Sequence, residues 1–308
     1  MEQLFLTAEN RYAGLTAYIQ KNQMKRIFLV CGRSLSLLPM DAYLTDLEKS
    51  GVRLIRFSDF QPNPLYESVV KGLVVFHLEK CDSIIAIGGG SAIDVAKCIR
   101  FYSCRPNQAA VFNEIQMVAI PTTAGTGSES TRFAVIYKNG EKQSISDESC
   151  LPSAVLLDPT TLTTLPDYPR KTSMLDALCH AIEAFWSVNS TEESRKYSRS
   201  AIQFILSGME PYLANRSEGN AIMLRAANLA GRAINIAQTT AGHAMCYKLT
   251  SLYGISHGHA AALCVRKLWP FMIENISLCT DERGAAYLMD TFSEIAKAMG
   301  CSSPIEAA

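Results

Sequence analysis

The periodicity of apolar residues changes once along this chain, near residue 169, and that change limits the folds open to it. Before it, short apolar runs that predict strands alternate with amphipathic stretches that predict helices. The predicted strands are RIFLVCG (26–32), VRLIRFSDF (52–60), DSIIAIGGG (82–90) and MVAIPTT (117–123). Strands that alternate with helices predict a mostly parallel, Rossmann-like α/β sheet that is covered on both faces.

After residue 169 the strand signals nearly vanish. Segments rich in Ala, Leu and Ile predict helices over 172–188, 192–213, 220–237 and 241–252. The two patterns meet at LLDPTTLTTLPDYP, where three prolines interrupt the chain. We therefore predict an α/β domain over residues 1–165 and an all-α domain over residues 166–308.

Charge and cysteine content narrow the functional class. The 308 residues include 29 Lys and Arg and 29 Asp and Glu, so no basic excess favours nucleic-acid binding. The ten cysteines form no CxxC pair, the start lacks the features of a secretory signal, and no apolar run is long enough to span a membrane. We therefore expect a cytoplasmic enzyme with reduced cysteines and with neither nucleic acid nor membrane as a partner.

Two polar, glycine-rich loops each follow a predicted strand. In IIAIGGGSAIDVAK (84–97), three glycines stand between a buried strand and a helix, whose first N–H groups favour a phosphate. PTTAGTGSES (121–130) also follows an apolar strand and is rich in hydroxyls. A tight turn alone would explain the first loop, but two such loops at neighbouring strand ends favour a nucleotide crevice. Neither loop carries the GxGxxG or P-loop fingerprint.

The helical half holds four of the five histidines, and one of them shares an apolar segment with an aspartate. In DALCHAIEAFW (176–186), Asp176 and His180 are four residues apart, so they lie on one face of a helix. A buried carboxylate needs a partner, which could be the histidine itself or a divalent cation. His243 and His257 flank further helical segments, and three histidines with one aspartate suit Zn²⁺ or Fe²⁺.

Five motifs occur in order along the chain: AIGGGSAIDVAK, IPTTAGTGSE, DALCHAIE, AGHAMCY and GISHGHAAAL. Together they resemble the iron-containing (group III) alcohol dehydrogenases over about residues 26–300, and most of all the phosphonoacetaldehyde reductase branch of that family. The resemblance implies a dehydroquinate synthase-like architecture, in which a Rossmann-like domain precedes a helical domain. It also implies a nicotinamide cofactor and one divalent metal.

By this resemblance, the catalytic site is a metal centre. Its ligands correspond to Asp176, His180, His243 and His257, and the metal would be Fe²⁺, with Zn²⁺ as the alternative. His259 would be a neighbour of the site. Tyr247 stands where some members carry another histidine, and because a phenol does not titrate near neutral pH, a proton relay through this position is in doubt.

The resemblance also assigns cofactor-binding residues. These correspond to Asn63, Gly89, Gly90, Ser91, Asp94, Thr122, Thr123, Ser128 and Lys142. Gly32 stands where many NAD-preferring members carry an aspartate, and Arg33 and Ser34 follow it. Loss of a carboxylate and gain of a cation suit a 2′-phosphate, so we predict NADP(H) over NAD(H). The alternative is that Arg33 is a solvated surface residue.

The implied reaction is aldehyde reduction, in which a metal polarises the carbonyl and the cofactor carries the hydride. Phosphonoacetaldehyde is the substrate that the branch implies, and its phosphonate needs a cation, for which Arg132 is the first candidate and Lys248 the second. Another small aldehyde or alcohol, a dehydroquinate synthase-like lyase and a non-catalytic cofactor-binding protein are the alternatives. The chain ends at CSSPIEAA, where family members continue for several helices, and the expected assembly is a homodimer.

Overall fold

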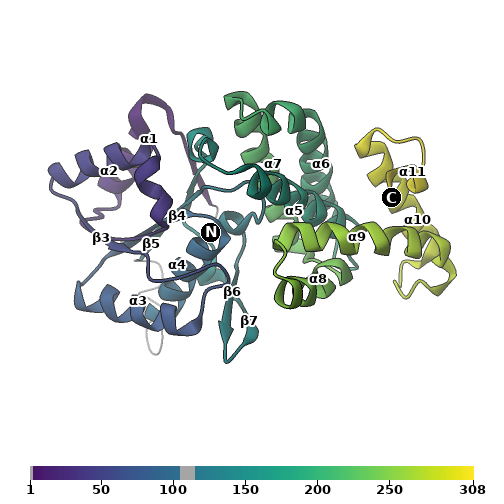
Figure 1. Cartoon of the computed structure of the whole chain (residues 1–308), viewed down its shortest axis with the longest axis horizontal. Helices are drawn as coiled ribbons and strands as arrows, with labels where there is room; N and C mark the ends of the chain where they lie inside the picture. Colours follow the sequence, from purple (N-terminus) through teal and green to yellow (C-terminus); the bar gives the residue numbers. More distant parts are fainter. Residues whose placement is uncertain (1–2, 105–114) are drawn as a thin grey trace. The chain divides into compact units, whose positions relative to one another are not determined.

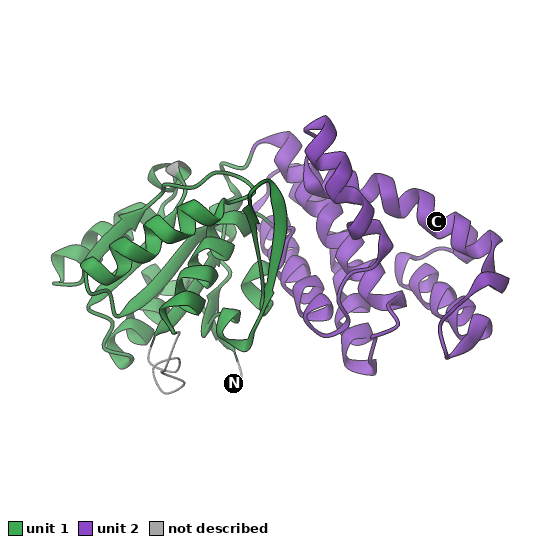
Figure 2. Ribbon diagram, turned by 90° about the horizontal axis from the view of Figure 1, so that it is seen from below, with its two compact units in different colours: residues 1–123, 128–165 green, residues 124–127, 166–308 purple. Residues whose placement is uncertain are grey.

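The computed structural model describes residues 3–104 and 115–308, without the side chain of Arg33. The chain divides into two compact units (Figure 2). Unit 1 comprises residues 1–123 and 128–165, and unit 2 comprises residues 124–127 and 166–308. The glycine-rich loop at 121–130 therefore contributes residues to both units.

Unit 1 is built on a six-stranded parallel sheet in the order β1-β8-β5-β4-β2-β3. Helices follow the strands and lie on both faces of the sheet (Figure 1). The strands are β1 (Leu4–Leu6), β2 (Arg26–Cys31), β3 (Arg53–Phe57), β4 (Ser83–Gly88), β5 (Gln116–Pro121) and β8 (Ala154–Leu156). The helices are α1 (Glu9–Lys21), α2 (Met40–Lys49), α3 (Tyr66–Leu78) and α4 (Gly90–Ser103).

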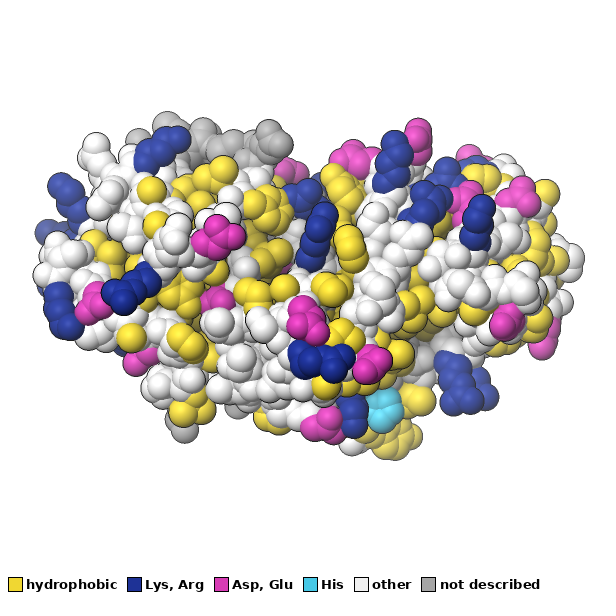
Figure 3. All heavy atoms as spheres, turned by 90° about the horizontal axis from the view of Figure 1, so that it is seen from above, with side chains coloured by type: hydrophobic (Ala, Val, Ile, Leu, Met, Phe, Trp, Pro, Cys, Tyr) yellow, Lys and Arg dark blue, Asp and Glu magenta, His cyan; other side chains and the backbone are white. Residues whose placement is uncertain are grey.

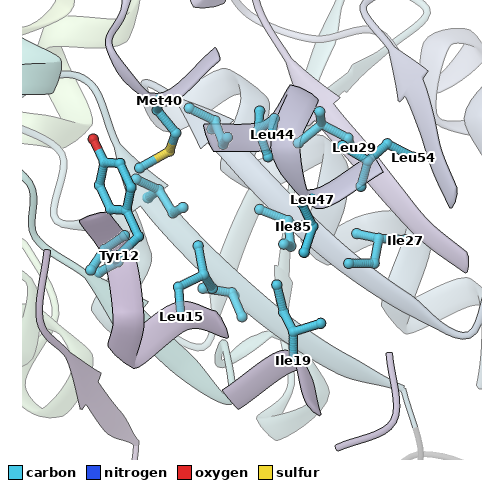
Figure 4. Packing of buried hydrophobic residues seen from close by; sticks show 14 of the residues in the cluster. Tyr12, Leu15, Ile19, Ile27, Leu29, Met40, Leu44, Leu47, Leu54 and Ile85 are labelled. Atoms are coloured by element: carbon cyan, nitrogen blue, oxygen red, sulfur yellow. The ribbon is translucent and has the colours of Figure 1, made fainter. Parts of the chain in front are cut away.

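Alternate residues of the central strands serve two separate cores, because successive side chains of a strand point to opposite faces. Ile27 and Leu29 of β2 pack in one cluster with residues of α1 and α2 (Figure 4). Phe28 and Val30 pack in the other cluster with residues of α3 and α4. Burial on both faces makes a strand a continuous apolar run, which is why the sequence predicted β2, β4 and β5. The fourth predicted strand, β3, is an edge strand that is only partly buried, and the three-residue strands β1 and β8 were not predicted.

A small antiparallel hairpin lies outside this sheet and was not predicted. It pairs β6 (Phe133–Lys138) with β7 (Glu141–Ser146). Asn139 and Gly140 form its turn, with φ of 54° and 78°. An Asn-Gly pair is a common hairpin signal because both positions can adopt positive φ, so the sequence could have predicted this hairpin.

Three polar residues on one face of α4, two of them buried and one half-buried, form hydrogen bonds to the surrounding loops. Lys97 Nζ donates to Thr131 O at 2.8 Å, to Thr131 Oγ1 at 3.0 Å and to Phe133 O at 2.7 Å. Arg100 donates to the carbonyls of Ile115 and Leu151, at 2.9 Å and 2.8 Å. The third is Asp94, one helical turn before Lys97. These bonds fix the chain that leads from the second glycine-rich loop into the hairpin.

Unit 2 is helical, and α5 packs against α6, α7 and α9. Its helices are α5 (Asp167–Trp186), α6 (Glu192–Leu213), α7 (Ser217–Ala237), α8 (Ala241–Tyr253), α9 (His257–Glu274), α10 (Gly284–Met299) and α11 (Pro304–Ala307). The sequence predicted α5 to α8. At the start of α11, Ser303 Oγ accepts from Glu306 N at 3.3 Å. We did not predict α9, which contains Pro270, or α10. The α/β unit followed by a helical unit confirms the predicted fold class.

The surface mixes charges of both signs, which are interspersed on the face that Figure 3 shows. Within residues 3–104 and 115–308, no helix combines the length and the apolar character that crossing a bilayer requires.

Candidate active site

Helix α5 carries the polar residues that the sequence singled out, and they are buried. Asp176 is 3% exposed and His180 is 6% exposed. The start of α9 lies against this part of α5, because a Cβ added to Gly258 would lie 2.1 Å from Thr172 O and 2.7 Å from Asp176 Cβ. The glycine after His257 therefore allows that histidine to approach Asp176.

Three of the four predicted ligands lie together in unit 2. One ligand atom from each of Asp176, His243 and His257 falls within 4.8 Å of the others. His243 Nε2 is 3.5 Å from Asp176 Oδ1, and His257 Nε2 is 3.9 Å from the same oxygen. His180 stacks on His243 with the ring centroids 4.4 Å apart. A carboxylate oxygen surrounded by imidazoles is the mixed donor set that Zn²⁺ and Fe²⁺ accept.

Hydrogen bonding shows that this set fits a metal ion. Among the described residues, Asp176 Oδ1, His180 Nδ1 and His243 Nε2 are buried atoms without a hydrogen-bond partner. Leaving such atoms unpaired is costly, so native proteins rarely do it without an ion or a water nearby. The other buried atoms without a partner among the described residues are serine and threonine hydroxyls and the indole nitrogen of Trp269. In this part of the chain, a carboxylate and two imidazoles without partners lie together only here, which is what a metal site would require.

The two buried histidines, His180 and His243, have pKa values that are shifted in opposite directions. Burial lowers the pKa of His180 to about 4, so its ring is neutral at physiological pH. Burial also acts to lower the pKa of His243, but the carboxylates of Asp176 and Glu183 outweigh it and raise this pKa to about 9. Burial acts to raise the pKa of Asp176, but the neighbouring histidines hold it well below its usual range.

Glu183 is the site residue that our sequence reading missed. Its side chain is fully buried on α5, and it accepts hydrogen bonds from the backbone N–H groups of Gly242 and His243 and from the His243 ring. The sequence could have indicated Glu183, because positions 176, 180 and 183 fall on one face of a helix. A glutamate near the end of a helix is usually solvated, and only the position of α8 shows that this one is not.

The remaining histidine neighbours also have partners. Cys246 Sγ lies 3.4 Å from His257 Nδ1, and the ring of Tyr247 stacks on His257 with centroids 5.2 Å apart. Tyr168 Oη lies 3.1 Å from His259 Nδ1. His259 thus interacts with the start of α5.

In unit 1, the predicted cofactor loops follow neighbouring strands. Cys31 at the end of β2 pairs with Ile87 of β4, and Gly88 at the end of β4 pairs with Pro121 at the end of β5. The chain runs from β2 outward to β3, and from β4 in the other direction to β5 and β8. The strand order therefore reverses between β2 and β4, which is where open α/β sheets bind nucleotides.

The glycine-rich loops meet at this edge of the sheet. Gly89 is the N-cap of α4, and Gly90 and Ser91 begin its first turn, where N–H groups are free to hold a phosphate. Thr122 N donates to Gly88 O at 3.0 Å, so the second loop starts beside the first. Thr123 continues that loop. This arrangement suits a pyrophosphate.

Other predicted cofactor residues hold the loops themselves. Ser128 Oγ donates to Asp94 Oδ1 at 2.7 Å, and Val135 N donates to Asp94 Oδ2 at 3.1 Å. Burial raises the pKa of Asp94, while the positive charges of Lys97 and of Lys142 on β7 act to lower it. Asp94 and Ser128 thus join α4 to the second loop and to the hairpin.

The residues predicted to contact the adenosine part of the cofactor are more exposed than those of the two glycine-rich loops. Gly32 follows β2 as the N-cap of a short 3₁₀ helix, and Ser34 is exposed. The side chain of Arg33 lies outside the described part of the structure. Asn63 is exposed in a turn with φ of 58°.

The two substrate candidates differ in their surroundings. Arg132 is half-buried beside β6, where it forms an ion pair with Glu148 at 3.6 Å. Lys248 is exposed on α8.

Comparison with known proteins identifies the family. The profile of the iron-containing alcohol dehydrogenases matches residues 5–159, and that of the Fe-containing alcohol dehydrogenase family, C-terminal, matches residues 171–307. This chain belongs to the iron-containing alcohol dehydrogenase family.

Several relatives in this family are moderately similar. The chain is 33% identical to a phosphonoacetaldehyde reductase of Streptomyces viridochromogenes over 74% of this chain and 63% of the relative. It is 32% identical to alcohol dehydrogenase 4 of Schizosaccharomyces pombe, over 73% of this chain and 56% of the relative. The chain therefore spans less than two thirds of the length of these two relatives.

Solved structures in the family share the fold. A crystal structure of 1,3-propanediol oxidoreductase superposes with a TM-score of 0.85 and 28% identity, and the match covers 96% of this chain and 78% of that one. An iron-containing alcohol dehydrogenase from Thermotoga maritima gives a TM-score of 0.80 at 25% identity, with coverage of 99% and 83%.

Proposed function

We propose that this chain is a metal-dependent, NAD(P)H-linked alcohol dehydrogenase that reduces small aldehydes. The observation that carries the proposal is the convergence of unpartnered buried atoms of Asp176 and His243, with His257, into one group of potential ligands. Family membership supplies the reaction class. The proposed metal is Fe²⁺, with Zn²⁺ as the alternative, because this donor set accepts both.

The proposed ligands are Asp176, His180, His243 and His257. When bound, the metal would act as a Lewis acid on a carbonyl oxygen, and the nicotinamide would supply the hydride. Asp176 offsets part of the positive charge in a buried place. His180 needs no deprotonation to act as a ligand, since its pKa is about 4. The side chain of His257 is 33% exposed, so the site is open to solvent on that side.

The proposed cofactor is NADP(H) in preference to NAD(H). The edge formed by residues 89–91 and 122–123 would hold the pyrophosphate, and Asp94, Ser128 and Lys142 support it. Gly32 leaves room after β2 and contributes no carboxylate that would repel a 2′-phosphate, while Arg33 and Ser34 follow it in the sequence. Asn63 would contact the adenosine side.

The proposed substrate is phosphonoacetaldehyde, or another small aldehyde that carries an anionic group. This proposal follows the similarity to the Streptomyces reductase, which is named for that aldehyde. Arg132 is the proposed phosphonate contact, because a phosphonate could compete with the exposed Glu148 for its guanidinium. Lys248, which is exposed on α8, is the second candidate.

Turnover by the purified full chain tests the reaction class. After loading with Fe²⁺ under anaerobic conditions, or with Zn²⁺, we expect about one bound metal per chain and oxidation of NADPH when phosphonoacetaldehyde is added. NADPH should give the higher kcat/KM. A strong preference for NADH would contradict the cofactor proposal, and a loaded chain without turnover on any aldehyde would contradict the enzyme proposal.

Arg132→Ala tests the substrate. Loss of a charge-assisted contact, worth about 1.5–3 kcal/mol, should raise KM for phosphonoacetaldehyde roughly tenfold or more and leave KM for propanal unchanged. Lys138→Ala removes an exposed cation from the adjacent hairpin and is the control. Equal effects of Arg132→Ala on both aldehydes would exclude the contact.

A further inference from the structure

Glu183 lies behind the proposed metal ligands and has a part in the site that family membership does not assign. Its side chain is fully buried on α5, seven residues after Asp176 and three after His180. All the groups that donate to it come from the first turn of α8 and the residue before that helix. One carboxylate therefore joins the helix that bears two proposed ligands to the helix that bears a third.

The first oxygen of this carboxylate caps α8. Glu183 Oε1 accepts from Thr240 N at 3.1 Å, from Thr240 Oγ1 at 2.5 Å and from Gly242 N at 2.9 Å. The first N–H groups of a helix have no partner within the helix, and the N-cap residue Thr240 makes no cap with its own side chain. Glu183 supplies that cap from another helix. Residue 242 must be a glycine for this approach, since a Cβ there would lie 2.9 Å from Oε1.

The second oxygen of Glu183, Oε2, contacts the imidazole of His243. Glu183 Oε2 accepts from His243 N at 3.2 Å and also contacts His243 Nδ1. A carboxylate is an acceptor only, so the proton of the neutral ring must lie on Nδ1. Nε2 then carries a lone pair, and this is the atom that lies 3.5 Å from Asp176 Oδ1 without a hydrogen-bond partner.

We propose that Glu183 is a positioning residue that fixes the orientation and the tautomer of His243, so that Nε2 is directed into the metal site. The inference rests on the proposed function, because it assumes that Asp176 and the histidines bind a divalent metal. Capping uses Oε1 and, through His243 N, also Oε2, whereas the ring N–H at Nδ1 requires that the atom at the Oε2 position be an acceptor. Carboxylates behind metal-binding histidines generally raise metal affinity in this way.

The variant Glu183→Gln distinguishes the capping of α8 from the positioning of His243. The amide oxygen can still cap α8, but the amide nitrogen at the other position is a donor and would force the His243 proton onto Nε2. We expect the metal-free variant to keep its helical circular dichroism. We expect its Kd for Zn²⁺, measured by competition with a chelator, to rise about 10- to 100-fold. Asp167→Asn removes an exposed carboxylate from the same helix and should leave this Kd unchanged.

The outcomes separate this inference from the proposed function. If the wild-type chain binds no Zn²⁺, the proposed function is overturned, and the role of Glu183 with it. If the wild-type chain binds Zn²⁺ and Glu183→Gln binds it with the same Kd, only the positioning role is overturned.

A second measurement needs no variant that might fail to fold. In the Zn²⁺-loaded wild-type chain, long-range ¹H–¹⁵N spectra of the histidine rings should show that His243 is protonated on Nδ1 and bound to metal through Nε2. A proton on Nε2, or binding of the metal through Nδ1, would overturn the inference.

Discussion

Helices α4 and α5 both carry buried or half-buried polar residues on one face, and the two helices differ in whether these residues have hydrogen-bond partners. On α4, Asp94, Lys97 and Arg100 all have partners in the chain, and Lys97 uses its three donors on Thr131 and Phe133. On α5, Glu183 is satisfied, but Asp176 and His180 each keep a buried atom without a partner. Both helices therefore bury polar groups, and the Ser103 hydroxyl at the end of α4 also lacks a partner. What indicates a ligand is that on α5 a carboxylate and an imidazole, and not a lone hydroxyl, are left incomplete.

The difference in hydrogen bonding between α4 and α5 has a physical consequence. A buried polar group that has its partners stabilises the fold and rigidifies its neighbourhood, whereas one without partners costs free energy unless something else binds it. On this reading α4 fastens the loops of unit 1, and α5 prepares a place for an ion. Substitutions in the two helices should then affect different observables.

The largest effect is expected from Asp176→Asn. The variant keeps the shape of the side chain and removes the charge that faces the histidines. Loss of one member of a buried charge pair costs about 3–5 kcal/mol, so affinity for Zn²⁺ should fall roughly 10²- to 10⁴-fold, and turnover should fall with it. Isothermal titration of the folded, metal-free variant checks this. If Asp176→Asn bound Zn²⁺ with the affinity of the wild-type chain, α5 would not differ from α4 in holding a metal.

Lys97→Met should affect stability and not the metal. It leaves the buried carbonyl oxygen of Thr131 and the partly buried one of Phe133 without their donor, at a cost of roughly 3 kcal/mol in the free energy of unfolding. Urea denaturation of the metal-free chain measures this, with the exposed Lys71→Met as the control, expected to change by less than about 0.5 kcal/mol. A change in Zn²⁺ affinity at unchanged stability would contradict the structural role of α4.

The smallest effect concerns pH. In the metal-free chain the pKa of His243 is raised to about 9, so below that pH a metal must displace one proton from the ring. Affinity for Zn²⁺ should therefore weaken about tenfold for each pH unit on going down from about pH 8 to about pH 6. His180, with a pKa of about 4, should add nothing in this range. Chelator competition at several pH values tests this, and a constant affinity would contradict it.

The sequence predicted some parts of the site better than others, for reasons of distance along the chain. Asp176 and His180 are separated by one helical turn, so their shared face follows from local geometry. The glycine-rich loops were found because β4 and β5 are buried runs that stop abruptly. The hairpin of β6 and β7 was missed because its strands are largely half-exposed or exposed and so lack a continuous apolar run, although Asn139 and Gly140 marked its turn.

By itself, the sequence determined the alternation of strands and helices in unit 1, the helical character of unit 2 and the face shared by Asp176 and His180. These depend on periodicity and on local spacing. Only the tertiary structure decided that Glu183 is buried, that it caps α8 from outside, and that His243 Nε2 faces Asp176. Such contacts join residues about sixty positions apart, and hydrogen bonds between distant segments follow from how helices pack and not from any local pattern.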